Sequence, residues 1–175
     1  LYSGALAAYW AYLVFQGLPR PLLIGAILAA ALAGGALCGL LAAAIRARFQ
    51  VDVIITTIML NYVVTYAMSW LLSGPWRDPS SYYQHTPAIA EAAQFAPLIA
   101  GSRLHLGFAL GLIAALLLYL LLHKTPLGFE VRAFGLNPVA ARFQGTNVTR
   151  ILLVVMLISG AMSGLAGASE LFGIH

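Results

Sequence analysis

The sequence predicts an all-α protein, a polytopic bundle of helices that cross a membrane. Of its 175 residues, 62% are hydrophobic and only 8% are charged, whereas soluble domains carry about 25% charged residues. Four apolar runs lack Asp, Glu, Lys and Arg, and each approaches or exceeds the roughly 20 residues that a membrane-spanning helix needs. They show no alternation of polar and apolar residues, so membrane-spanning strands are not expected.

The apolar runs define the expected spans. They cover residues 22–45, 53–72, 104–122 and 151–168. A fifth run, residues 1–15, opens the chain, and at about 22 Å it is too short to cross a hydrocarbon core of ~30 Å by itself. We therefore expect one partial membrane domain, a fragment that shows about five spans of a longer protein.

The basic residues predict which loops face the cytoplasm. Loops on one side hold Arg46, Arg48, Lys124, Arg132, Arg142 and Arg150, and loops on the other side hold Arg20, Arg77 and Arg103. Because basic residues concentrate in cytoplasmic loops, residues 46–52 and 123–150 are expected inside and residues 73–103 outside. A re-entrant segment near residues 51–57 is the alternative that would change this orientation. The net charge of +4 thus indicates topology, and no nucleic-acid partner is expected.

The outer loop is rich in turn-forming residues and in aromatic residues typical of a membrane interface. The aromatic residues are Trp76, Tyr82 and Tyr83, and such side chains concentrate at the level of the lipid headgroups. Residues 88–99 are predicted to form a short amphipathic helix on the outer surface.

Small residues at four-residue spacing predict close helix packing. One pair, Gly35 and Gly39, lies in the run 22–45, and a second, Gly160 and Gly164, lies in the run 151–168. Small residues at this spacing let two helix backbones approach closely in lipid. We expect these glycines to pack spans together inside one bundle, although a place beside a transport path is the alternative.

The run 53–72 carries the polar residues of greatest interest. Thr57, Asn61 and Thr65 are spaced four residues apart, on one face of a helix, with Tyr62, Tyr66 and Ser69 in an adjacent stripe. An asparagine inside the membrane is costly unless it finds a polar partner. Either it bonds to another helix, or Thr57, Asn61, Thr65 and Tyr62 form the wall of a translocation path.

No enzymatic chemistry is indicated. The chain lacks nucleophile, zinc-protease and phosphate-binding lysine motifs, so it is not expected to hydrolyse ATP. Its one cysteine, Cys38, cannot form an internal disulfide and is interpreted as a small buried side chain. His85 and His105 are too isolated to predict a metal site. Glu170 closes the last span and is expected at the interface. No cofactor is expected.

The loop 123–150 is predicted to contain two short helices. Each has a capping residue, a proline at its start and a glycine at its end. Thr125 can cap a helix that starts at Pro126 and is expected to stop at Gly135, and Asn137 can cap a second helix that starts at Pro138 and stops at Gly145. The first carries an apolar face of Leu127, Val131 and Phe134, and the second an apolar pair of Val139 and Phe143. Such short helices are not stable alone, so each needs a surface. Asn147 is expected to cap the following span.

Three blocks of the sequence resemble a family of bacterial ABC-transporter permeases. They are VIITTIMLNY at residues 53–62, TPLGFEVRAFGLNPVAARFQGTNVTR at 125–150 and LISGAMSGLAGASELFG at 157–173. Together they are similar to inner-membrane permeases of the branched-chain amino acid, ribose and nucleoside type, nearest to the nucleoside and simple-sugar subgroup. The resemblance covers about residues 22–173.

The resemblance implies that the loop couples the permease to its ATPase subunit. The residues that match the family pattern are Gly135, Asn137, Pro138, Ala140, Ala141, Arg142 and Gly145, and the implied coupling loop also includes Phe143. The chain departs from the family pattern at Thr146, where Ile or Val is common, and at Val139, where an acidic residue is common. The family implies about ten spans per subunit in the bacterial cytoplasmic membrane.

The same resemblance implies a function and its partners. The chain would be the permease of an ABC importer for a nucleoside or simple sugar. It would work with a separate ATP-binding cassette subunit, a second permease subunit and an extracytoplasmic substrate-binding protein, in contact with membrane lipid. An ion-coupled secondary transporter or channel is the alternative, but it would need the buried ionisable residues that these spans lack.

Overall fold

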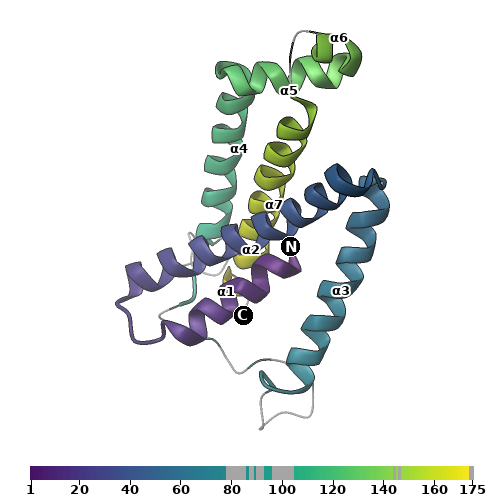
Figure 1. The fold of residues 1–175 in the computed structure, drawn as a ribbon. Helices are drawn as coiled ribbons and strands as arrows, with labels where there is room; N and C mark the ends of the chain where they lie inside the picture. Colours follow the sequence, from purple (N-terminus) through teal and green to yellow (C-terminus); the bar gives the residue numbers. More distant parts are fainter. Residues whose placement is uncertain are drawn as a thin grey trace.

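The structure is a computed structural model that describes residues 1–77, 86, 89, 93–95, 105–143, 145 and 147–173. Within these residues the chain forms seven α-helices (Figure 1). They are α1 (Tyr2–Val14), α2 (Arg20–Phe49), α3 (Val53–Ser73), α4 (Leu106–Lys124), α5 (Pro126–Leu136), α6 (Pro138–Phe143) and α7 (Val148–Gly173).

Four of the described helices, α2, α3, α4 and α7, are long and apolar enough to cross a membrane. The predicted all-α, polytopic fold is therefore confirmed, and α2 and α7 extend beyond the apolar runs that predicted them. The helix α3 is continuous from Val53, and its start is capped by Asp52, whose Oδ1 accepts a hydrogen bond of 2.8 Å from the N–H of Ile54. Residues 53–57 are therefore part of one continuous helix, with no break that would form a separate segment.

The first helix is short and packs inside the bundle. With 13 residues, α1 is below the length of a spanning helix, and it packs against α2 and α7. That residues 1–15 belong to a span stays a prediction. The expectations for Tyr82, Tyr83 and most of residues 88–99 lie outside the described residues.

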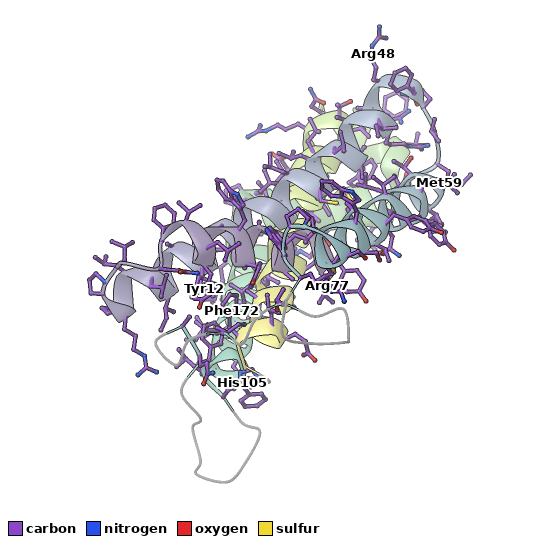
Figure 2. The ribbon with its side chains drawn as sticks, turned by 90° about the horizontal axis from the view of Figure 1, so that it is seen from below. Tyr12, Arg48, Met59, Arg77, His105 and Phe172 are labelled. Atoms are coloured by element: carbon purple, nitrogen blue, oxygen red, sulfur yellow. The ribbon has the colours of Figure 1, made fainter. Side chains whose placement is uncertain are left out.

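The core lies where α1, α2 and α7 meet. Its buried side chains include Tyr9 and Tyr12 of α1, Ile27 of α2 and Phe172 of α7. The rings of Tyr12 and Phe172 lie 6.0 Å apart, edge to face, and Figure 2 shows the two side chains close together, whereas Met59 of α3 points away from the bundle. Aromatic pairs of this geometry stabilise a core beyond the area that they bury.

The helices α2 and α7 cross in close contact at positions occupied by glycines. A Cβ atom at Gly35 would clash with the carbonyl oxygen of Gly160, and one at Gly164 would clash with the carbonyl oxygen of Ala31. At Gly39 the clash would be with the carbonyl oxygen of Met156. The structure thus brings the two glycine pairs of the sequence together, backbone against backbone. Figure 1 shows α2 running across α7 at this point.

A sharp bend joins α4 to α5. The hydroxyl of Thr125 donates a hydrogen bond of 2.6 Å to the carbonyl of Leu121 and accepts one of 3.1 Å from the N–H of Gly128. Gly128 is buried, and a Cβ atom there would clash with the backbone of Leu121 and Leu122. One hydroxyl therefore ties the end of α4 to the start of α5, which holds α5 across the ends of α4 and α7 (Figure 1).

One prediction for the loop 123–150 is wrong, namely the residue at which its first helix ends. Gly135 does not end its helix, because α5 continues to Leu136, and among the described glycines only Gly145 has a positive φ. The C-cap is instead Asn137, in an extended conformation. The extended backbone that the Asn-Pro sequence favours ends the helix, so the glycine is not needed for it.

Candidate functional site

The loop that was singled out in the sequence forms a capped helix at the tip of the molecule. The side chain of Asn137 accepts a hydrogen bond of 3.0 Å from the N–H of Val139, which caps the start of α6. After α6, Gly145 adopts a φ of 83° and its N–H bonds to the carbonyl of Arg142 at 3.0 Å. Both ends of the six-residue α6 are thus fixed by local bonds, although so short a helix is unstable alone.

The tip exposes apolar side chains away from the spans. Phe143 and Leu136 are each 88% exposed and Val139 is 61% exposed, whereas Ala141 is 2% exposed. Arg142 is exposed beside them. The side chains of Pro138 and Ala140 are outside the described part of the structure. Exposed aromatic and basic residues around a rigid helix are the composition of a protein-binding surface.

The two glycines of this loop should respond differently to substitution. Gly145→Ala should loosen the end of α6 by about 1–2 kcal/mol, because a Cβ atom is strained at positive φ. Gly135→Ala should be neutral or stabilising, since Gly135 lies inside a helix and a Cβ atom would meet nothing within 4 Å. Hydrogen exchange of the α6 amides in the assembled protein measures the difference. Equal exchange rates in both variants would contradict this account of Gly145.

A cavity of about 290 Å³ lies between α1, α2, α3 and α7. Its polar lining comes from Ser3, Thr57, Asn61, Ser159 and Ser163, with the thiol of Cys38. The glycines Gly35, Gly39 and Gly160 of the helix crossing also line it. The cavity therefore lies directly beside the crossing of α2 and α7.

The candidate path residues of α3 divide between two sides of the helix. Thr57 and Asn61 line the cavity, whereas Tyr62 and Thr65 do not. Tyr62 is 55% exposed, and the hydroxyl of Thr65 donates a hydrogen bond of 2.8 Å to the carbonyl of Asn61. In a helix of 3.6 residues per turn, each residue four positions further along is offset by about 40° around the helix axis. Thr65 has therefore rotated away from the face that Thr57 begins.

Four polar residues of the cavity were not predicted as path residues from the sequence: Ser3, Cys38, Ser159 and Ser163. Ser159 and Ser163 stand among the small residues of α7, and Cys38, interpreted as a small buried side chain, is half-buried. The signal that could have found the serines is their own four-residue spacing, which places both hydroxyls on one face of α7. No sequence pattern predicts the cavity itself, because it forms only when four helices pack together.

A second, apolar cavity of about 710 Å³ lies between α4 and α7. His105 lies at its end, and its Nδ1 accepts a hydrogen bond of 3.1 Å from the N–H of Gly107, which caps α4. His105 therefore has a structural role that the sequence did not predict. Glu170 is exposed near the end of α7.

Together, the four long apolar helices are those of a multi-pass membrane protein. A family comparison makes this specific: the sequence profile of the branched-chain amino acid transport system / permease component family matches residues 2–175. The chain belongs to this family of ABC-transporter permeases, which are proteins of the cytoplasmic membrane.

The curated relatives extend the family assignment. The guanosine ABC transporter permease protein NupP of Bacillus subtilis is 37% identical, over 99% of this chain and 50% of that protein. The nucleoside ABC transporter permease protein NupB of Lactococcus lactis is 30% identical, over 98% of this chain and 49% of that protein. A glucose ABC transporter permease protein of Haloferax volcanii is 32% identical, over 99% of this chain and 48% of that protein. The chain spans about half the length of these curated relatives. No solved structure matches it.

Proposed function

We propose that the chain is the membrane-spanning part of an ABC importer permease that carries nucleosides or simple sugars. The printed names of the relatives, which include guanosine, nucleoside and glucose permease proteins, support this substrate range. The observation that carries the proposal is the tip formed by α5 and α6, because a permease without an ATPase site needs a rigid surface on which the ATPase acts.

The tip has the properties that force transmission requires. Its exposed apolar side chain, Phe143, provides an anchor for a partner's pocket, and the caps at Asn137 and Gly145 keep α6 from unwinding under load. The bend at Thr125 connects α5 firmly to α4, and α5 also packs against α7. Movement of a bound ATPase subunit would therefore reach two long helices at once.

The remaining partners follow from the same proposal. ATP is bound and hydrolysed by a separate subunit, a second permease subunit completes the path, and an extracytoplasmic binding protein delivers the solute. The rival function, an ion-coupled transporter, has less support. Its mechanism needs ionisable groups inside the membrane, and the central parts of α2, α3, α4 and α7 contain no Asp, Glu, Lys or Arg.

Site-directed crosslinking tests the docking of the ATPase. In a Cys38→Ser background, Val139→Cys should crosslink to the ATPase subunit of the intact transporter, because Val139 is 61% exposed on α6. The matched control is Ala141→Cys two residues away, which is 2% exposed and should not react. An active transporter in which neither Val139→Cys nor Phe143→Cys crosslinks would rule out α6 as the docking helix.

A further inference from the structure

We propose that Thr125 is a positioning residue for energy coupling, which holds α4 and α5 together as one rigid, L-shaped unit. Movement of the ATPase subunit, received at the tip, then enters the membrane first through α4. This inference rests on the proposed function and deepens it, since it names the helix and the residue that transmit the movement. Loss of the Thr125 hydroxyl should therefore separate ATP hydrolysis from transport without detaching the ATPase subunit.

Thr125 takes part in three hydrogen bonds at the joint between α4 and α5. Its hydroxyl donates to the carbonyl of Leu121, in the last turn of α4, at 2.6 Å, and accepts from the N–H of Gly128, in the first turn of α5, at 3.1 Å. The carbonyl of Thr125 accepts a further hydrogen bond of 3.1 Å from the N–H of Phe129. Because one hydroxyl serves both helices, opening the bend breaks at least one of its two bonds.

Gly128 prevents the bend from closing further. It is buried, and a Cβ atom there would clash with the carbonyl oxygens of Leu121 and Leu122. The first turn of α5 therefore already rests on the backbone of the last turn of α4, which cannot move aside as a flexible side chain would. Since Thr125 opposes opening and Gly128 opposes closing, the direction in which α5 leaves α4 is fixed from both sides (Figure 1).

Local sequence stiffens the joint as well. Thr125 is in an extended conformation, with φ −118° and ψ 154°, because a proline ring disfavours the helical backbone at the residue before it. Pro126 has a fixed φ and no N–H that would need a partner at the start of α5. On α4, the ring of His123 stacks on that of Tyr119 at 4.4 Å, and its Nδ1 bonds to the carbonyl of Tyr119 at 3.0 Å. The end of α4 is therefore held against fraying.

The contact of α5 with α7 has a different character. Leu127 and Val131 of α5, with Val155 and Ile158 of α7, line a largely apolar hollow of about 270 Å³. Among the residues that the structure describes, no hydrogen bond joins α5 to α7. Apolar contacts are not directional, so α5 can shift slightly on α7 at little cost. It cannot turn relative to α4 without losing the bonds of Thr125, and α4 is therefore the first helix to follow the ATPase subunit.

The amount of solute carried per ATP hydrolysed tests the role of Thr125. The complete transporter is measured in proteoliposomes, with radiolabelled guanosine or glucose as the solute. Thr125→Val keeps the size and branching of the side chain but removes the hydroxyl, and should lower this ratio about tenfold, the effect of losing about one hydrogen bond. The crosslink of Val139→Cys to the ATPase subunit should be unchanged, because α6 still docks.

Two further variants accompany Thr125→Val. Thr125→Ser keeps the hydroxyl and should restore most of the coupling ratio, which a merely bulky requirement at this position would not explain. Thr149→Val makes the same exchange at an exposed threonine in the first turn of α7, away from the joint, and should be neutral.

A distance measurement tests the rigidity of the joint without relying on activity. In a Cys38→Ser background, spin labels are attached at Leu117→Cys on α4 and Arg132→Cys on α5, both of which are exposed positions. The labels should give a narrow distance distribution in the complete transporter, and Thr125→Val should broaden it, whereas Thr125→Ser and Thr149→Val should not.

Two results would overturn the proposal. One is a distribution that stays narrow in Thr125→Val, and the other is a fall in uptake matched by an equal fall in ATP hydrolysis. The proposed function fails separately, if the unaltered transporter takes up neither solute with ATP and its Val139→Cys variant does not crosslink to the ATPase subunit.

Discussion

Phe143→Asp is expected to lower ATP-driven uptake by about 30-fold, the effect of losing one interface hot spot of about 2 kcal/mol. Phe143 is 88% exposed at the end of α6, so the substitution should leave the permease folded. A carboxylate in the partner's apolar pocket would be buried without a counter-charge. Uptake into proteoliposomes and co-purification of the ATPase subunit measure the effect.

The control for Phe143→Asp is Phe143→Leu, which keeps an apolar anchor and should retain most of the uptake. Lys124→Ala, at the end of α4 and away from α6, should also be close to neutral. Full uptake by Phe143→Asp, with the ATPase subunit still bound, would contradict the docking of α6 through its aromatic anchor.

Gly164→Leu is expected to destabilise the bundle by about 3 kcal/mol or more, the upper range for overpacking a filled contact. Gly164 lies between three helices, because a Cβ atom there would clash with the carbonyl of Ala31, and one at Gly4 would clash with the backbone of Gly164. Backbone atoms cannot move aside as a flexible side chain would. Thermal unfolding of the purified protein in detergent should show a lower midpoint and lower yield.

Gly25→Leu provides the matched control for Gly164→Leu. Gly25 lies in α2, and a Cβ atom there would meet nothing within 4 Å, so the variant should unfold close to the unaltered midpoint. Because leucine is a better helix former than glycine, a similar loss of stability in both variants would contradict the role of the crossing of α2 with α7.

Local chemistry explains most of what the sequence could predict. The membrane spans follow from the length of the apolar runs. The starts of α5, α6 and α7 follow from Thr125, Asn137 and Asn147, whose side chains accept hydrogen bonds from the first turn of each helix in the structure. The wrong end of α5 has the same origin, because a glycine favours a helix stop but does not require one, and here Leu136 continues the helix before Asn137 ends it.

The arrangement around the cavity could not be predicted in the same way. Spacing alone places Thr57, Asn61 and Thr65 on one side of α3, but the edge of the cavity depends on how α3 is rotated against α2 and α1. That rotation is a property of tertiary packing. The same reason applies to Cys38 and Ser159, which are ordinary small residues of a membrane helix until their neighbours enclose a space.

The glycine crossing has a mechanical consequence. At the crossing itself the backbones of α2 and α7 touch with no side chain between them, so movement at that point needs no change of rotamer. The cavity lies beside this crossing, whereas α5 packs against the distant end of α7. Under the proposed function, a push on α5 would turn α7 about this crossing, a rigid-body movement of the kind by which transporters alternate access.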